Sequence, residues 1–212
     1  MTQLRFDEMS LSRFADELGS DAATPGGGSA SALAGALAAS LVAMVARTTA
    51  TGKAFADRAE EMNEITGEAD RLRDELLGLV DEDATSFDQV MAAFRLPKET
   101  PEQQATRSEE IQKGYQAAVH PPMLVCRGAV RLLELALQIA ERGKPNAVSD
   151  AGVAALLAAT SLEGAALNVR INLSSITDTA FHTAQSEALG ELLAQGQALR
   201  AEALAAVSTK LS

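Results

Sequence analysis

The feature that most constrains this chain is a stretch without any charged side chain, from Ser29 to Ala46, built mainly from alanine, serine and glycine. Such small residues favour a helix whose backbone lies close to its neighbours, because no bulky side chains hold the helices apart. A membrane-spanning helix would contain more large apolar residues. We therefore interpret the stretch as a buried interior helix of a cytoplasmic protein.

The rest of the chain also favours helices, since Ala, Leu, Glu and Gln are abundant and β-branched residues are sparse. Apolar residues recur at spacings of three and four along the segment after Gly52. They are Met62, Ile65, Ala69, Leu72, Leu76, Leu79 and Val80. We predict an all-α fold: an up-and-down bundle of five to six long helices, forming a single domain over residues 1–212.

Glycine, proline and capping residues set the predicted helix ends. The expected helices cover about residues 11–18, 29–49, 54–94, 101–141, 149–173 and 178–210, with caps at Ser10, Thr100, Ser149 and either Thr177 or Asp178. Pro121 and Pro122 fall inside the fourth helix. Each proline removes a backbone donor and crowds the preceding turn, so we expect a break or sharp kink there.

Charge and cysteine content exclude several classes of partner and compartment. The net charge is −11 and the isoelectric point is near 4.7, whereas nucleic acids and anionic membranes require a basic face. The single Cys126 excludes an intramolecular disulfide and fits a reducing compartment. The first residues contain acidic side chains and no apolar core, which is not typical of a signal peptide.

A glycine-rich turn, Pro25-Gly26-Gly27-Gly28-Ser29, leads into the uncharged helix. The first N–H groups of a helix are free and partly positive, so this turn can bind an anionic or carbonyl-rich ligand. It can equally serve only to let two helices approach closely. The Lys that follows the last glycine in a nucleotide-binding P-loop is absent.

Three acidic residues, Asp81-Glu82-Asp83, occur within the third helix. Asp83 and Phe87 are one turn apart and share a face. A carboxylate beside an apolar wall has a raised pKa, as a general acid or base near neutral pH requires. The alternative is a solvated acidic face with no chemical role.

Two further polar clusters are candidates for binding. Asn146, Ser149 and Asp150 surround the start of the fifth helix, although capping alone explains Ser149 and Asp150. Asn168 and Asn172 are one turn apart later in that helix and can bond a flat heterocycle or each other. His120 and His182 have no partners at metal-ligand spacing, so we expect no metal site.

Five segments in one order resemble the folate cyclodeaminase/methenyltetrahydrofolate cyclohydrolase family. They are Thr24-Pro25-Gly26-Gly27-Gly28-Ser29-Ala30-Ser31-Ala32, Asp83-Ala84-x-x-Phe87, Leu96-Pro97-Lys98-x-Thr100, Ser149-Asp150-x-Gly152-Val153-Ala154 and Asn168-x-x-Ile171-Asn172-Leu173. The resemblance extends from about Leu11 to Phe181. The chain departs from the family pattern at Lys144, where the family often has asparagine.

The resemblance implies a helical homodimer that binds a tetrahydrofolate derivative as its substrate, beside the subunit interface, and uses no cofactor or metal. It places the catalytic acid at Asp83, with Asp81 as a possible neighbour. The candidate substrate-binding residues are Pro25, Gly26, Gly27, Gly28, Ser29, Lys98, Asn146, Ser149, Asp150, Asn168 and Asn172. Lys98, like the further candidates Arg47, Arg127 and Arg170, is chosen from chemistry alone for the glutamate carboxylates.

Two reactions occur in the family that the chain resembles. The favoured one is hydrolysis of 5,10-methenyltetrahydrofolate to the 10-formyl form, because no formimino-transferring domain precedes the bundle. The alternative is cyclisation of 5-formiminotetrahydrofolate to the 5,10-methenyl form with loss of ammonia. A non-catalytic helical folate-binding module is the second alternative. Neither nucleic acid nor membrane is an expected partner.

Overall fold

The computed structural model of the chain describes residues 5–212, and these residues form helices and no strand. The α-helices are α1 (Leu11–Leu18), α2 (Gly27–Ala50), α3 (Ala59–Phe94), α4 (Pro101–Arg142), α5 (Val148–Leu173) and α6 (Thr179–Leu211). Three short 3-10 helices join or precede them: η1 (Phe6–Glu8), η2 (Lys53–Arg58) and η3 (Pro145–Ala147). The all-α prediction is therefore confirmed.

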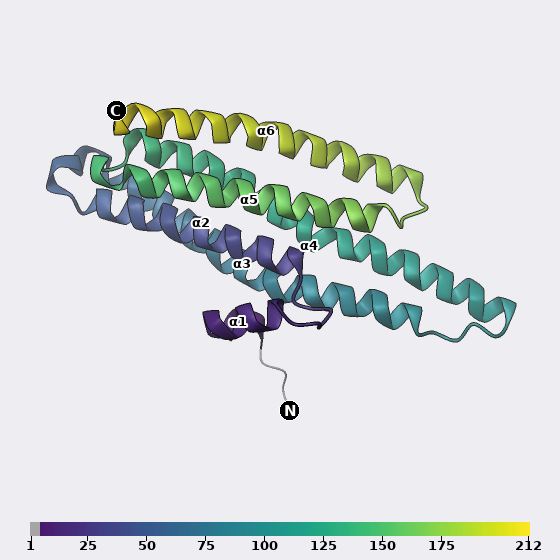
Figure 1. Cartoon of the computed structure of the whole chain (residues 1–212). Helices are drawn as coiled ribbons and strands as arrows, with labels where there is room; N and C mark the ends of the chain where they lie inside the picture. The colour runs from purple at the N-terminus through teal and green to yellow at the C-terminus, as the bar shows by residue number, and fades with distance from the viewer. Residues whose placement is uncertain (1–4) are drawn as a thin grey trace.

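The long helices lie side by side in two layers (Figure 1). Helices α2 and α5 run antiparallel in the front layer of this view, and α3 and α4 form a long hairpin behind them. The turn of that hairpin extends past the ends of α2 and α5, while α6 covers α4 and α5 and the short α1 lies below α2. One continuous apolar cluster fills the space between the helices.

Small side chains let α2 and α5 approach closely, as the uncharged stretch predicted. A Cβ added to Gly164 would overlap the Ser31 hydroxyl, and one added to Gly35 would lie 2.7 Å from the Ser161 hydroxyl. By length and composition, the segments Gly27–Ala50 and Pro145–Leu173 could cross a membrane. Their most apolar windows are 61% and 56% buried inside the bundle, however, as core helices of a soluble protein also are.

The prolines inside α4 do not interrupt it, so of the break or kink expected at Pro121 and Pro122, the break is wrong. The structure has one uninterrupted helix from Pro101 to Arg142. Pro122 has no N–H for the carbonyl of Ala118, four residues earlier. The Asn172 side chain on α5 donates to this carbonyl instead, with an Nδ2–O distance of 2.7 Å. A non-local bond thus replaces the local one.

The predicted caps have mixed outcomes. Thr100 forms a capping box with Gln103, and Asp178 accepts bonds from the first N–H groups of α6, as expected. Ser149 is not the cap of α5. The helix begins at Val148, because the 3-10 turn η3 leads the backbone directly into helical geometry at that residue, and Ala147 takes the cap position.

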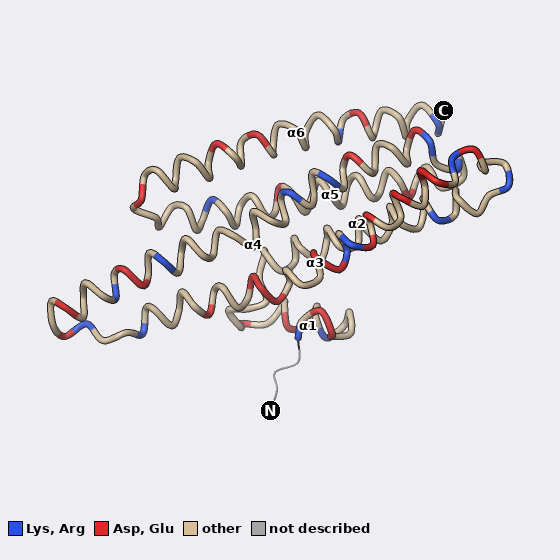
Figure 2. Tube along the Cα trace, turned by 180° about the vertical axis from the view of Figure 1, so that it is seen from behind, with Lys and Arg blue, Asp and Glu red and all other residues tan. Residues whose placement is uncertain are grey.

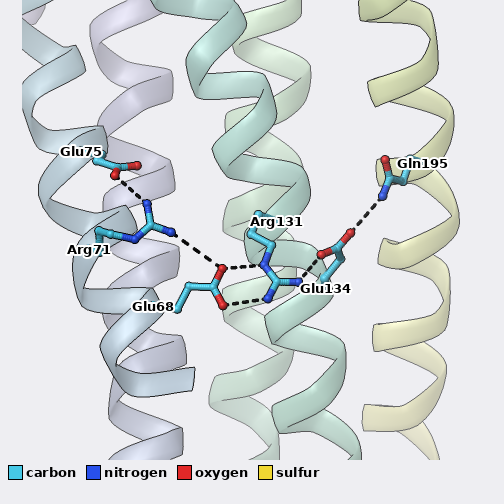
Figure 3. Close-up of polar contacts among 6 residues, drawn as sticks. All are labelled: Glu68, Arg71, Glu75, Arg131, Glu134 and Gln195. Atoms are coloured by element: carbon cyan, nitrogen blue, oxygen red, sulfur yellow. Dashed lines mark hydrogen bonds and ion pairs between the residues drawn. The ribbon is translucent and has the colours of Figure 1, made fainter. Parts of the chain in front are cut away.

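An ion-pair network connects α3, α4 and α6 on the back of the bundle. Arg131 donates from two nitrogens to the two oxygens of Glu68, both at 2.7 Å, and also bonds Glu134 (Figure 3). Glu134 in turn accepts from Gln195 at 3.0 Å. Hydrogen bonds from Arg131 lower the pKa of Glu68. Figure 2 shows that charges of both signs are spread along these outer helices.

Candidate active site

A pocket of about 390 Å³ lies where the start of α2 meets the C-terminal third of α3, the first half of α4 and the last turns of α5. Its lining residues are Ala23, Thr24, Gly26, Gly27, Gly28, Asp83, Ser86, Phe87, Val90, Met91, Phe94, Tyr115, Ala118, Asn168, Ile171, Asn172 and Ser175. The fold thus brings together three of the four polar sites proposed from the sequence: the glycine turn, Asp83 and the two asparagines of α5.

Asp83 reaches from α3 to the N-terminus of α2. Its Oδ2 lies 3.2 Å from the hydroxyl of Ser29, which is fully buried. The Ser29 hydroxyl is also 2.9 Å from the Val80 carbonyl, so it can donate to either acceptor. A Cβ at position 28 would overlap the Asp83 carboxyl group. Glycine is therefore required at position 28 to make room for this carboxyl group.

The surroundings of Asp83 favour its neutral form more than water does. Burial raises the pKa of Asp83 above its ordinary value of 3.8, and hydrogen bonds from the Ser29 side chain and backbone partly oppose this rise. The positive end of the α2 dipole favours the charged form as well. A carboxyl group held between these opposing effects can both accept and return a proton, as a general acid–base catalyst must.

Aromatic side chains form one wall of the pocket. Phe87 and Phe94 from α3 and Tyr115 from α4 line it, in a chain with only six phenylalanines and one tyrosine. The rings of Phe94 and Tyr115 pack edge to face with centroids 6.2 Å apart. Flat aromatic walls suit a ligand with flat rings.

The sequence analysis placed Phe87 beside Asp83, which the structure confirms, but it missed the rest of the aromatic and apolar wall. Val90, Met91 and Phe94 continue the face of Phe87 at helical spacing, so this signal was present in the sequence. Tyr115 had no such signal, because its position depends on how α4 docks against α3.

The two asparagines of α5 point their amide nitrogens at carbonyl groups of the protein. Asn168 Nδ2 donates to the Gly164 carbonyl at 3.0 Å, and Asn172 Nδ2 donates to the Ala118 carbonyl at 2.7 Å. The two side chains therefore do not bond each other, although both line the pocket beside the glycine turn.

Asp81 does not lie beside Asp83 in the pocket. Its carboxylate accepts hydrogen bonds from the backbone N–H groups of Phe6, at 2.8 Å, and Asp7, at 3.4 Å. It also lies 3.6 Å from the Nε atom of Arg5. Asp81 thus caps η1 and attaches the start of the described chain to α3, so its geometry supports a structural role instead of the expected catalytic one.

Three other predicted binding residues lie at the far end of α2. Asn146, Ser149 and Asp150 are next to the C-terminal end of that helix, where the Lys144 N–H donates to the Thr49 hydroxyl at 2.9 Å. The pocket is at the N-terminal end, roughly 35 Å away for a helix of this length. Within one chain, these residues and Asp83 do not share a pocket.

The remaining candidates also fall outside the pocket lining. Pro25 is buried behind the glycine turn, and Lys98 is exposed in the turn between α3 and α4. Arg47 pairs with Asp70, and Arg170 is exposed on α5. Among residues 5–212, no group of three or more His, Cys, Asp or Glu side chains is arranged to hold a metal ion.

A larger hollow of about 550 Å³ lies between α3 and α4 on the back of the bundle. Of the residues singled out from the sequence as potential ligand-binding groups, it contains only Arg127. Its other cation, Arg131, is already paired with Glu68 and Glu134, and three acidic side chains line the same hollow. The pocket with Asp83 is smaller, but it holds the proposed chemical groups and is the better candidate site.

Comparison with known proteins gives matches over nearly the whole chain. The formiminotransferase-cyclodeaminase family model matches residues 10–191. A methenyltetrahydrofolate cyclohydrolase from Methylorubrum extorquens is 38% identical over 95% of this chain and 97% of its own length. The formimidoyltransferase-cyclodeaminase of Rattus norvegicus is 32% identical over 96% of this chain, which spans only 38% of that longer protein. The crystal structure of formiminotetrahydrofolate cyclodeaminase from Thermotoga maritima superimposes with a TM-score of 0.89 at 29% identity, covering 97% of this chain and 99% of that one.

Proposed function

Because this chain belongs to the formiminotransferase-cyclodeaminase family, we propose that it is a tetrahydrofolate one-carbon enzyme. Its reaction is the methenyltetrahydrofolate cyclohydrolase reaction, in which 5,10-methenyltetrahydrofolate and water give 10-formyltetrahydrofolate. The observation that carries the proposal is the half-buried Asp83, with its raised pKa, in a pocket walled by aromatic rings and amides. The 38% identity to a cyclohydrolase of nearly the same length supports this choice of reaction.

The substrate's bridging carbon is already electrophilic, because it lies between two nitrogens that share a positive charge. Asp83 as the carboxylate stabilises this cation and takes a proton from water as the water oxygen bonds to the carbon. The resulting acid returns the proton to N5 as the bond between that nitrogen and the bridging carbon breaks. The new hydroxyl loses its proton to become the formyl group, so one proton is released overall. These steps call for no cofactor or metal.

Ser29 suits this cycle because its hydroxyl faces two acceptors. It donates to the Asp83 carboxylate in one state, and in the other it donates to the Val80 carbonyl and accepts from the protonated acid. Either protonation state of Asp83 thus keeps its hydrogen-bond partner. This arrangement supports a residue that changes protonation state in every turnover.

The cyclodeaminase reaction is the second candidate, and the similarity to the Thermotoga maritima and Rattus norvegicus proteins favours it. In the cyclodeaminase reaction, 5-formiminotetrahydrofolate closes to the 5,10-methenyl form with loss of ammonia, and Asp83 would protonate the departing amine. The same pocket and the same acid serve both reactions. A folate-binding module without catalysis remains the third candidate.

Absorbance of the methenyl compound in the near ultraviolet distinguishes these candidates. Purified protein that accelerates the loss of this absorbance is a cyclohydrolase, and protein that generates it from the formimino compound is a cyclodeaminase. The Asp83→Asn variant should lose on the order of 10²–10⁴-fold in turnover while still binding folate. Absence of both activities in the wild-type protein would contradict an enzymatic role, and full activity in the variant would contradict the role of Asp83.

We also propose that the protein is a soluble cytoplasmic homodimer whose subunits meet through α2 and α5. These helices lie together in the front layer of Figure 1, and exposed apolar side chains recur along both of them. The exposed residues are Leu37, Met44, Val153, Leu156, Leu167 and Ile171. Large exposed apolar side chains gathered on neighbouring elements are typical of an interaction surface. Because Ile171 also lines the pocket, the proposed interface would adjoin the proposed folate site.

A further inference from the structure

The bond between Asn172 and α4 exists because of a proline. Pro122 cannot donate to the Ala118 carbonyl, and Ala118 is only 4% exposed, so water has little access to it. A buried carbonyl without a partner is costly. Asn172 supplies the missing donor at 2.7 Å. The matching carbonyl for Pro121 belongs to Ala117, which is exposed and can bond water.

This bond fixes which end of the Asn172 amide faces which neighbour. A carbonyl can only accept, so the Asn172 nitrogen must face Ala118, and a rotated amide would oppose two acceptors. The Asn172 oxygen has no hydrogen-bond partner among residues 5–212, and the side chain lines the pocket. Asn168 is arranged alike, one turn earlier, with its nitrogen on the Gly164 carbonyl.

We propose that Asn172 is a specificity-determining residue whose amide oxygen accepts a hydrogen bond from an N–H group of the bound ring system. Pro122 orients Asn172 for this purpose by leaving the Ala118 carbonyl free to hold its nitrogen. Asn168 and Asn172 together give this side of the pocket two amide oxygens that can accept hydrogen bonds from N–H groups of a ligand. The inference rests on the proposed function, in which the ligand is a pteridine whose pyrimidine edge carries an amino group and a ring N–H.

The Asn172 bond to Ala118 also stabilises the fold, so the experiment measures unfolding and ligand binding separately. Four variants are compared: Asn172→Leu, Pro122→Ala, the double variant, and Asn63→Leu as a control. Asn63 is exposed on α3, away from the pocket, and undergoes the same chemical change. Thermal unfolding and the Kd for 5,10-methenyltetrahydrofolate are measured for each, the latter under conditions in which turnover is blocked by Asp83→Asn.

Asn172→Leu leaves the Ala118 carbonyl unpaired and should lower Tm. In the double variant, the alanine that replaces Pro122 supplies a backbone N–H to that carbonyl, so Tm should recover. Binding should not recover, because the acceptor oxygen is still missing. We expect Kd to rise about tenfold in both variants, as the loss of one buried hydrogen bond predicts, and to stay unchanged in Asn63→Leu.

An analogue that lacks the 2-amino group tests the ligand side of the same bond. The protein with Asn172 should bind it about tenfold less tightly than the parent compound, and the double variant should bind both alike. If Pro122→Ala restores binding as well as Tm to Asn172→Leu, Asn172 is structural and the inference is wrong. If the protein with Asn172 binds no folate compound, the proposed function fails first and this inference fails with it.

Discussion

At the scale of the residue, the ionised form of Asp83 lowers the stability of the folded protein, because its carboxylate is partly buried. The carboxyl group is pressed against Gly28 at the start of α2 and accepts from Ser29. Burial opposes ionisation, and the hydrogen bonds and the helix dipole favour it. The balance leaves the folded protein with a higher affinity for the proton at this position than the unfolded chain has.

That balance predicts how Asp83→Asn changes stability with pH. Above the raised folded pKa, the ionised Asp83 costs stability that the neutral asparagine does not, so the variant should unfold at a higher temperature than the wild type. As pH falls toward 3.8, the ordinary value, the folded wild type takes up its proton and the difference should shrink. Thermal unfolding between pH 4 and pH 8 measures it. A constant difference over this range would contradict a raised pKa.

Ser29→Ala should move the pH profile of turnover. The Ser29 hydroxyl lowers the pKa of Asp83, so its removal raises that pKa further. The reaction needs the carboxylate as a base, and the acidic limb of kcat should therefore shift to higher pH. Ser40→Ala is the matched control, because Ser40 lies on the same helix and its hydroxyl donates to the Ala36 carbonyl, away from Asp83. A shift of equal size in the control would rule out this explanation.

At the scale of the element, helix pairs are held by different means in the two layers. Small residues such as Ser31 and Gly164 let α2 and α5 meet with little side-chain volume between them. Helices α3 and α4 are instead joined by the ion pair of Arg131 with Glu68, and Glu134, which also pairs with Arg131, accepts a hydrogen bond from Gln195 of α6. The side chains of this network are partly exposed, so solvent and salt weaken it.

Arg131→Met tests how much this network contributes. The variant keeps an apolar side chain of similar length but loses the bonds to Glu68 and Glu134. We expect a loss of about 1 kcal/mol in the free energy of unfolding at low salt. Because the folded pKa of Glu68 is lowered, this contribution is present above pH 4.5 and fades as pH falls below it.

Chemical denaturation at low and high salt checks the prediction. The difference between wild type and Arg131→Met should shrink at high salt, because the ion pairs are screened. Arg71→Met is the control, since Arg71 is the more exposed member of the same network and its pair with Glu75 lies within one helix. A larger loss in Arg71→Met than in Arg131→Met would contradict the central position of Arg131.

At the scale of the whole molecule, the two layers of the bundle differ in their outer surfaces. Charged residues are spread along the outer helices, as Figure 2 shows, while α2 and α5 carry exposed apolar side chains. The uncharged stretch of α2 therefore buries the side chains of one face in the core and exposes those of the other face to solvent. The proposed homodimer buries this exposed face.

Leu156→Glu should weaken that dimer. Leu156 is 43% exposed on α5, and a charge there would be buried without a partner in a symmetric interface. The expected result is a fall from dimer to monomer mass in light scattering coupled to size-exclusion chromatography. Leu211→Glu serves as control, because Leu211 is 64% exposed at the far end of α6. A monomeric wild type, or a dimeric Leu156→Glu, would contradict the proposed interface.

Local sequence patterns determined the all-α class, most helix ends and part of the site. Helical spacing alone puts Asp83 and Phe87 on one face, and Asn168 and Asn172 on another. Glycines before the uncharged helix indicate a close approach, which the structure identifies as that of the Asp83 carboxyl group to Gly28. Each of these features depends on residues within a few turns of one another, so the sequence contains the whole signal.

Only the tertiary structure decided which of these groups meet. In the folded chain, Asn146 lies roughly 35 Å from Asp83. Asp81 accepts hydrogen bonds from the backbone of η1, and Tyr115 lines the pocket. The tertiary structure also brings Asn172 from another helix to the carbonyl that Pro122 leaves free inside the uninterrupted α4. Helical periodicity specifies a face and not its partner. The partner follows from the packing of whole helices, to which residues far apart in the sequence contribute together.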